Sequence, residues 1–212
     1  MSTRVGPWRL VVADLDGTLV TGTTACVHLD DWIGHGPVIR DLERRFASGE
    51  ITNTQVAETY APCYRDIALA DATAVMAQIP VLDDIALGVS LLSRRCIEAV
   101  IATASWSFTA EALADLWGFT RVRGADLEVD DATGLFTGRV SRHCEPEDKV
   151  TFVAEQCQRL GGRFRSGRGH RGWAISPAVV PVRRVQASRL RLHPRCKQPH
   201  RPLSTATLFS MP

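Results

Sequence analysis

The chain has 212 residues, of which 45% are hydrophobic and 23% are charged. These are ordinary values for a globular protein, and the length suits one domain or one core with a modest insertion. No apolar run approaches the roughly 18 residues that cross a membrane, and the first ten residues, MSTRVGPWRL, lack the apolar centre of a secretory signal. The sequence therefore predicts a cytoplasmic protein without a membrane partner, and it leaves the oligomeric state open.

The formal net charge of +2 hides two segments of opposite sign. Residues 1–155 contain all 23 acidic residues and 13 basic ones, whereas residues 156–212 contain 12 basic residues and no acidic one. A folded domain rarely keeps so long a stretch free of carboxylates, so the two segments need separate interpretations.

Strands and helices alternate along the first segment. The apolar run at 8–13 predicts a buried strand that leads into the turn-like sequence DLDGT at 14–18. Residues 99–104 predict a second strand, and residues 108–117 predict a helix that ends at Gly118. This alternation favours an α/β fold, with a Rossmann-like core built on a parallel sheet.

Further elements extend this core on both sides of the second strand. Apolar stripes at helical spacing between 21 and 92 predict an inserted helical unit, in which Pro62 kinks or ends a helix. Turn residues at 130–134 between two short apolar runs predict a hairpin, and Pro146 suits the first turn of a last helix. We therefore expect a core at 1–20 and 93–162, a helical cap at 21–92, and an atypical, irregular and disordered basic tail at 163–212.

Asp14 and Asp16 are the strongest candidates for chemistry. They follow an apolar strand directly, and ligands of open α/β sheets bind at the carboxyl ends of strands. One carboxylate can attack a phosphorus atom while the other carries a proton to the leaving group. Gly17 allows a close backbone approach. The alternative is that this pair belongs to a surface turn or a simple cation site.

Ser105 and Lys149 could complete such a site. Ser105 ends the second predicted strand, which places it beside Asp14 in a parallel sheet, and its hydroxyl could donate to a phosphoryl oxygen. Its structural alternative is a helix N-cap. Lys149 lies in the first turn of a predicted helix, where the helix dipole disfavours a cation unless an anion is bound nearby. Its alternative is an ordinary exposed lysine.

Together these motifs resemble the haloacid dehalogenase superfamily. The resemblance rests on DLDGT at 14–18, a strand ending in Ser105 with Phe108 three residues later, the stretch 118–138 ending in LFTG, and Lys149. It covers residues 8–161, and it is strongest to the phosphoserine-phosphatase-like branch. That branch has a helical cap similar to 21–92, including the sequence FASGEIT at 46–52.

The resemblance implies a Mg²⁺-dependent phosphatase that acts on a small phosphorylated metabolite. Asp14 would be the nucleophile that forms an aspartyl-phosphate, and Asp16 would protonate the leaving alcohol and then activate water. Ser105 would hold phosphoryl oxygens, and Lys149 would neutralise negative charge. Mg²⁺ would bind the Asp14 carboxylate and the Asp16 carbonyl oxygen. Gly17, Thr18 and Trp106 would contact the substrate.

Two departures from the family pattern affect these expectations. Phosphoserine phosphatases have a glutamate where this chain has Thr23 and a cap arginine where it has Tyr60, so phosphoserine is not the expected substrate. Trp106 replaces a glycine and should reshape the pocket. The family also completes its metal site with a carboxylate after the Lys149 helix, yet the region 163–173 contains none, and its one candidate ligand is His170, a weak choice for Mg²⁺.

Three interpretations of the tail follow. It could be an arm that binds nucleic acid or an acidic partner, although it contains no recognisable nucleic-acid module, so a nucleic-acid partner is not expected. It could be the divergent end of a catalytically inactive binding protein that keeps only the fold. It could also be translated from a shifted reading frame, the interpretation we favour, because arginine and proline are frequent and acids are absent. The enzyme is therefore expected to be impaired.

Overall fold

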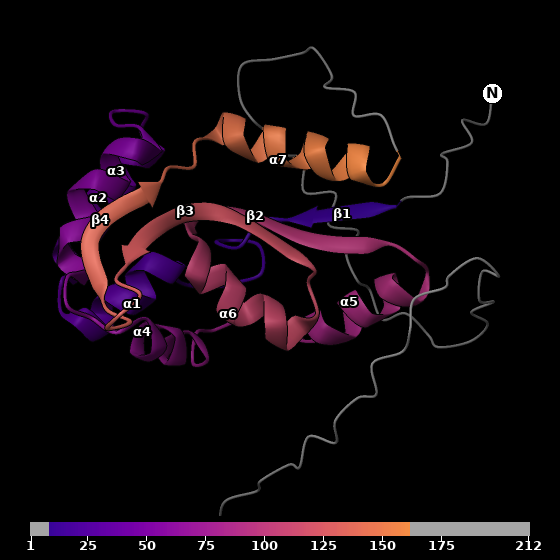
Figure 1. The fold of residues 1–212 in the computed structure, drawn as a ribbon, viewed down its shortest axis with the longest axis horizontal. Helices are drawn as coiled ribbons and strands as arrows, with labels where there is room; N and C mark the ends of the chain where they lie inside the picture. Colours follow the sequence, from indigo (N-terminus) through magenta and orange to yellow (C-terminus); the bar gives the residue numbers. More distant parts are fainter. Residues whose placement is uncertain (1–8, 162–212) are drawn as a thin grey trace, which may run out of the picture.

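The structure is a computed structural model that describes residues 9–161. A run of helices separates β1 from β2, and one helix separates β2 from β3, as the sequence predicts (Figure 1). In chain order the elements are β1 (Leu10–Ala13), α1 (Ala25–Ile33), α2 (Gly36–Ala47), α3 (Asn53–Tyr60), the 3-10 helix η1 (Ala61–Tyr64), α4 (Leu69–Met76), α5 (Ile85–Arg94), β2 (Glu98–Trp106), α6 (Ser107–Trp117), β3 (Arg121–Val129), β4 (Phe136–Arg142) and α7 (Pro146–Arg159).

The four described strands form one mixed sheet in the order β1-β2-β3-β4. β1 and β3 both pair in parallel with β2, and Ala13 lies opposite Ile101 in the first of these pairs. β4 runs antiparallel to β3 as the second strand of the expected hairpin. The expectation of a parallel sheet therefore holds for β1 to β3, while the hairpin makes the whole sheet mixed. The α/β class and the Rossmann-like arrangement are confirmed.

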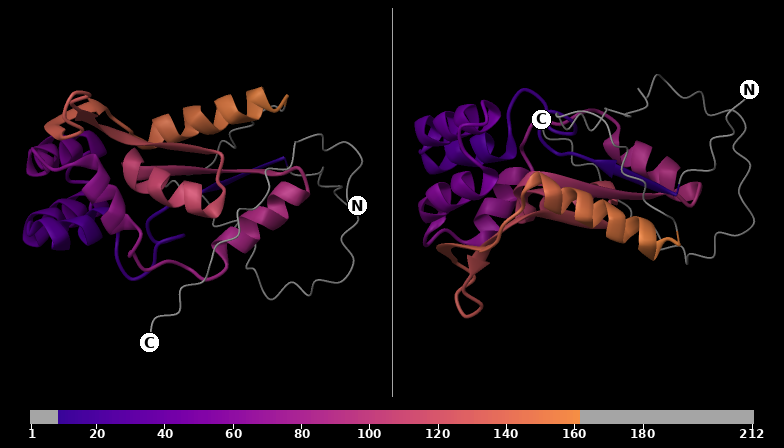
Figure 2. Two further views of the ribbon diagram at one scale, coloured as in Figure 1. Left: turned by 60° about the horizontal axis from the view of Figure 1, so that its bottom comes forward. Right: turned by 90° about the horizontal axis from the view of Figure 1, so that it is seen from above.

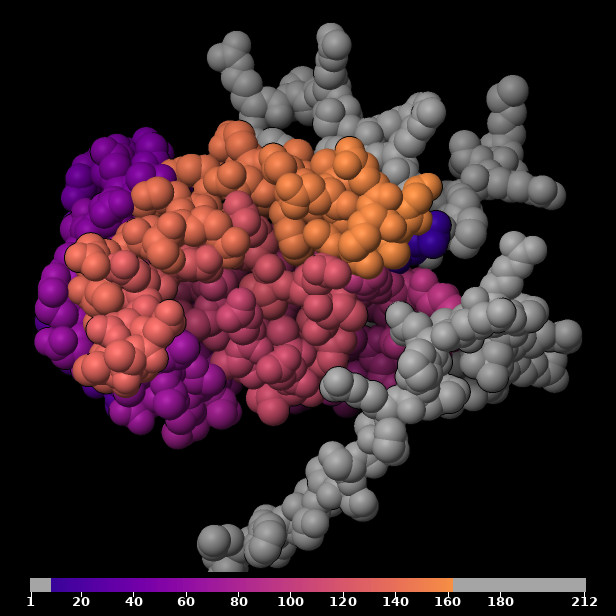
Figure 3. All heavy atoms as spheres, in the orientation of Figure 1, coloured from indigo at the N-terminus to yellow at the C-terminus, as the bar shows by residue number. Residues whose placement is uncertain are grey.

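Helices cover both faces of this sheet. Figure 1 shows α7 on one face and α5 with α6 on the other, and Figure 2 shows the same layers from two further directions. Phe152 of α7 packs against Val100 and Ala102 of β2. The strands β1 and β2 end toward the group formed by α1, α2, α3 and α4 (Figures 1 and 2). In Figure 3 the atoms of α7 and of the hairpin form one continuous surface with those of β3 and α6.

Local signals in the sequence explain where several helices begin and end. The Thr24 side chain accepts a hydrogen bond from the Val27 amide at the start of α1, and Thr52 and Gln55 form a capping box at the start of α3. Helix α3 gives way to the 3-10 helix immediately before Pro62, as the missing proline amide requires. Gly118 ends α6 in the left-handed conformation.

Helix α5 lies within the range 21–92 that the sequence assigns to the cap, except for its last two residues. It nevertheless packs against β2 and α6, which belong to the sheet layer. The expected domain boundaries remain predictions, and the expectation for 163–212 lies outside the described residues. No helix within residues 9–161 has both the length and the apolar character needed to cross a membrane.

Candidate active site

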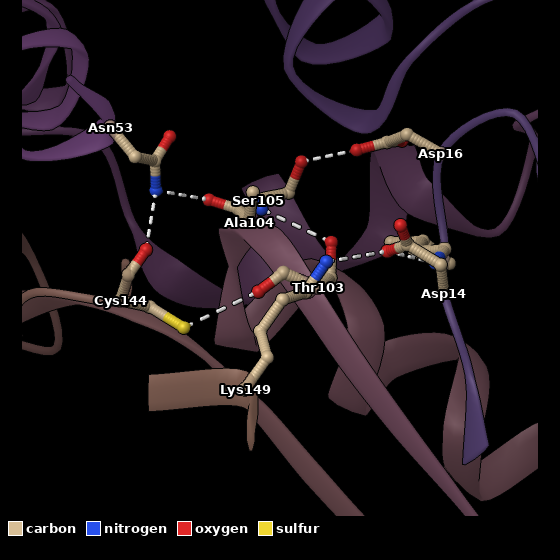
Figure 4. Close-up of polar contacts among 9 residues, drawn as sticks. Asp14, Asp16, Asn53, Thr103, Ala104, Ser105, Cys144 and Lys149 are labelled. Atoms are coloured by element: carbon tan, nitrogen blue, oxygen red, sulfur yellow. Dashed lines mark hydrogen bonds and ion pairs between the residues drawn. The ribbon is translucent and has the colours of Figure 1, made fainter. Parts of the chain in front are cut away.

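The ends of β1 and β2 bring the candidate residues together. Asp14 follows the last residue of β1 directly, and Ser105 is the second-last residue of β2. Because these strands pair in parallel, both side chains emerge at the same edge of the sheet. Figure 4 shows Asp14, Asp16, Ser105 and Lys149 around one space at that edge.

Both described polar contacts of the Asp14 carboxylate are made by the same oxygen, Oδ1. Its Oδ1 accepts a hydrogen bond of 2.9 Å from the Leu15 amide and lies 3.2 Å from Nζ of Lys149. The Lys149 side chain keeps only 13% of its surface exposed, against 36% for Asp14. Within the described residues nothing donates a hydrogen bond to Oδ2, so this oxygen is free to face a ligand.

Asp16 occupies a more enclosed position than Asp14. Its Oδ1 accepts a hydrogen bond of 2.7 Å from the Ala25 amide at the start of α1, and its Oδ2 contacts the Ser105 hydroxyl. Burial raises the pKa of Asp16 above its ordinary value, and the neighbouring Asp14 charge raises it further. The hydrogen bonds and Lys149 lower it only in part. The proton therefore stays on Asp16 to a higher pH than on an ordinary aspartate.

Ser105 does not act as a helix N-cap. The N-cap of α6 is Trp106, which makes no side-chain capping bond, whereas the Ser105 hydroxyl donates to Asp16. The Ser105 amide donates to Oγ1 of the buried Thr103 over 3.1 Å. Gly124 of β3 lies directly against this segment, since a Cβ there would meet the Ser105 carbonyl oxygen at 2.6 Å. The backbone around Ser105 is thus closely supported.

A cavity of about 350 Å³ opens from these residues toward the cap helices. It brings together Asp14, Asp16, Ser105 and Trp106 among the predicted site residues, while Lys149 is linked to it through Asp14. Gly17 and Thr18 do not line it, and the φ of +70° shows that Gly17 is required by the turn itself. The full lining is Asp14, Asp16, Thr24, Cys26, Ile39, Glu43, Phe46, Ala47, Asn53, Val56, Ala57, Tyr60, Thr103, Ala104, Ser105, Trp106 and Ala125.

Asn53 is a site residue that the sequence analysis missed. Its Nδ2 donates to the carbonyl oxygens of Ala104 and Cys144, over 2.9 Å and 2.8 Å, so the first residue of α3 is tied to β2 and to the loop before α7 (Figure 4). The neighbouring Thr54 amide donates to Glu145 over 2.7 Å. The capping pattern at 52–55 indicates the start of a helix, but no sequence signal indicates these partners.

Glu43 is a second residue that the sequence analysis missed. It lies on α2, lines the cavity, and accepts a hydrogen bond of 2.5 Å from the Thr24 hydroxyl. Tyr60 also lines the cavity, and its hydroxyl donates to the buried Asp30. The acids that meet the cavity therefore come from the cap as well as from the sheet.

The donors for a divalent cation are incomplete within the described residues. Residues 9–161 contain no group of three or more histidine, cysteine, aspartate or glutamate side chains arranged to hold a metal. Both carboxylate oxygens of Asp16 are occupied by Ala25 and Ser105, and Oδ1 of Asp14 by Leu15 and Lys149. A complete Mg²⁺ site does not fit these residues alone, and His170, which the sequence offers only as a weak candidate ligand, lies outside them.

The fold and the site together define an α/β protein with paired aspartates at a strand end. A sequence model of haloacid dehalogenase-like hydrolases matches residues 11–168, which is most of the chain. The chain therefore belongs to the haloacid dehalogenase-like hydrolase family, as the resemblance of its motifs predicts. Among curated proteins, no sequence matches the chain.

Solved structures share this fold at low sequence identity. A haloacid dehalogenase family hydrolase from Salmonella enterica serovar Typhi matches with a TM-score of 0.63 and 12% identity, over 74% of this chain and 54% of that chain. A substrate-bound phosphoserine phosphatase matches with a TM-score of 0.62 and 14% identity, over 74% of each chain. A protein of unknown function from Bordetella pertussis Tohama I matches at 22% identity with a TM-score of 0.57, over 74% of this chain and 78% of that chain. The similarity to the phosphoserine-phosphatase-like branch is thus confirmed for the fold.

Proposed function

We propose that the chain hydrolyses a small phosphomonoester through a covalent aspartyl-phosphate on Asp14. The observation that carries this proposal is the arrangement of two aspartates with different environments, one paired with Lys149 and the other enclosed beside Ser105. Two carboxylates in such different environments can take different roles, one as a nucleophile and the other as a proton carrier. Membership of the hydrolase family supports the same assignment.

Asp14 is the proposed nucleophile. The Leu15 amide and Lys149 both bind Oδ1, which orients the carboxylate and leaves Oδ2 to attack the phosphorus atom. As the new bond between Oδ2 and phosphorus forms, the bond between phosphorus and the leaving alcohol oxygen breaks. The Lys149 ammonium lies where negative charge gathers during this step, so it stabilises the transition state more than the free enzyme.

Asp16 is the proposed acid and base. Because its pKa is raised, its carboxyl group can donate a proton to the leaving alcohol oxygen, and the resulting carboxylate can then accept a proton from water. That water attacks the aspartyl-phosphate, releases inorganic phosphate and restores the Asp14 carboxylate. The Ser105 hydroxyl, which contacts Asp16 in the free chain, turns toward a phosphoryl oxygen when the ester binds.

Magnesium dependence is part of the proposal, although the described donors do not complete a site. A bound Mg²⁺ would supply further neutralisation of the phosphoryl charge. Residues 156–212 contain no acidic side chain, and residues 9–161 bring no third acidic side chain to this position. We therefore expect weak metal binding and a slow enzyme.

The shortage of metal donors among residues 9–161 also supports a second candidate, a catalytically inactive binding protein that keeps the fold. Release of phosphate from p-nitrophenyl phosphate distinguishes the two, measured with the whole chain in Mg²⁺ and again with EDTA. The enzyme proposal predicts turnover that EDTA removes and that the Asp14→Asn variant lacks. Binding of phosphate without any turnover in either condition would favour the inactive protein.

A further inference from the structure

The cavity beside the catalytic residues has an unusual charge balance. Three carboxylates line it, on Asp14, Asp16 and Glu43, and no described lining residue is an arginine, a lysine or a histidine. Lys149 is paired with Asp14 at the sheet edge, which leaves the cap side of the cavity without a cation among the residues that the structure describes. An anionic group on the leaving alcohol would therefore meet carboxylates, apolar side chains and uncharged polar groups such as Thr24 and Asn53, with no cation among the described lining residues to balance its charge.

Glu43 is the charged residue among the described residues that line the cap side of the cavity. It receives one hydrogen bond, from Thr24, and it forms no ion pair with any residue in the range 9–161. Burial raises the pKa of Glu43, and the charges of Asp16 and Asp30 raise it further. A partly buried carboxylate without a cationic partner is costly, and a bound cation would offset both its lost hydration and its repulsion by the other acids.

Aromatic rings complete the same wall. Phe46, Tyr60 and Trp106 line the cavity. The rings of Tyr60 and Trp106 each meet Tyr64 edge-on, with centroids 5.2 Å and 5.8 Å away, so neither can turn aside easily. Tyr60 and Trp106 are only 1% and 3% exposed, so these rings form a fixed apolar wall beside the Glu43 carboxylate. The remaining cap-side lining residues are mostly small or aliphatic and would fit the carbon chain of an alcohol.

We propose that the leaving group of the substrate is a short alcohol bearing an ammonium group and no carboxylate, and that the Glu43 carboxylate binds that ammonium within the cavity lined by Phe46, Tyr60 and Trp106. This inference rests on the proposed phosphatase function and specifies its substrate class. The phosphoryl group would lie at the sheet edge beside Asp14, with the ammonium directed toward α2 and α3. Phosphoesters of ethanolamine and choline have this chemistry.

The test compares esters that differ only in charge. Phosphocholine and its neutral isostere 3,3-dimethylbutyl phosphate have the same shape, so the ratio of their kcat/KM values measures recognition of the cation. We expect a ratio of about ten or more, the range that one such cation site provides. Phosphoethanolamine should likewise exceed phosphoserine, which differs from it only by a carboxylate.

Variants locate the effect within the cavity. In Glu43→Gln the ratio of kcat/KM for phosphocholine to kcat/KM for 3,3-dimethylbutyl phosphate should fall close to one. The amide keeps the shape of the side chain but loses its charge. Glu50→Gln is the matched control, since Glu50 is exposed and pairs only with Arg45 over 2.7 Å among the described residues. An unchanged ratio in Glu43→Gln, or an equal loss in both variants, would overturn the assignment of Glu43.

Binding separates this inference from the proposed function. Calorimetry with the whole-chain Asp14→Asn variant, using phosphocholine and 3,3-dimethylbutyl phosphate as probes, measures the preference without turnover. Preferential binding of phosphocholine with no hydrolysis of any ester by the natural chain supports the inference and contradicts the phosphatase function. Hydrolysis of both esters at equal rates and with equal affinity supports the phosphatase function and overturns the inference.

Discussion

Nζ of Lys149 lies 3.2 Å from Oδ1 of Asp14, although 135 residues separate them in the chain. Lys149 lies in the first turn of α7, next to the acidic residues Glu147 and Asp148. The positive end of the helix dipole is at this end of the helix. A cation is unfavourable for the helix at that place. Its partner across the sheet edge explains its position, and that partner is the proposed nucleophile.

Replacing Lys149 should therefore impair turnover more than stability. For Lys149→Met we expect kcat/KM to fall about 10²- to 10³-fold, the usual effect of removing one charge-stabilising group, while the free energy of unfolding changes little because the Asp14 side chain stays 36% exposed to water. Phosphate release and thermal unfolding measured on the same preparation give both values. A large loss of stability with unchanged turnover would assign Lys149 to the framework.

Asp16 should make stability depend on pH. In the unfolded chain its carboxyl ionises near the ordinary value of 3.8, whereas burial keeps it protonated to a higher pH in the folded state. The folded state thus binds the proton more tightly, and stability falls as pH rises between the two pKa values. The Asp16→Asn variant cannot ionise, so it should be inactive yet more stable than the natural chain at neutral pH.

The extra stability of the Asp16→Asn variant should disappear as the pH is lowered. Melting temperatures of both chains, taken from about pH 4 to about pH 8, measure the difference, and for a chain of this size 1 kcal/mol corresponds to about 2–4 °C. Asp115→Asn is the matched control for the loss of an acid, because Asp115 lies on the exposed face of α6. Equal melting temperatures of the natural chain and Asp16→Asn at neutral pH would contradict a raised pKa at Asp16.

The hydrogen bonds of Asn53 between the cap and the sheet should contribute to the free energy of unfolding. Asn53→Ala removes the donor for two carbonyl groups, on Ala104 and Cys144, and should cost about 1–3 kcal/mol of stability. Asn53→Asp also loses the donor and should be no better. Thr54→Ala is the matched control, because only the backbone amide of Thr54 makes a bond to Glu145. Urea unfolding would contradict the prediction if the Asn53 and Thr54 variants were equally stable.

The sequence predicts the framework of this site well because the decisive signals are local. A strand before Asp14, a strand through Ser105 and a proline at the start of the Lys149 helix each follow from nearby residues, and parallel pairing of the two strands then brings their ends together. Glu43 and Asn53 escape prediction for a physical reason. Glu43 belongs to the amphipathic helix α2 and Asn53 is the buried first residue of α3, and neither local pattern shows which strand end the residue meets.

The roles of individual residues depend on finer geometry than a motif contains. The sequence leaves Ser105 open between a helix cap and an active-site donor, and the hydrogen bond to Asp16 removes the cap alternative. Gly17 and Thr18 belong to the same motif as Asp14, yet neither of them lines the cavity. Their expected contact with the substrate stays a prediction.

Acid-quenched phosphoryl transfer tests the central claim most directly. The whole chain is mixed with p-nitrophenyl phosphate and Mg²⁺, quenched in acid, digested, and examined by mass spectrometry for a phosphoryl group on the peptide containing Asp14. The proposed mechanism predicts that Asp14 carries the phosphoryl group and that the Asp14→Asn variant carries none. Phosphate release at an undiminished rate in Asp14→Asn, with no phosphoryl group on Asp14 of the natural chain, would contradict it.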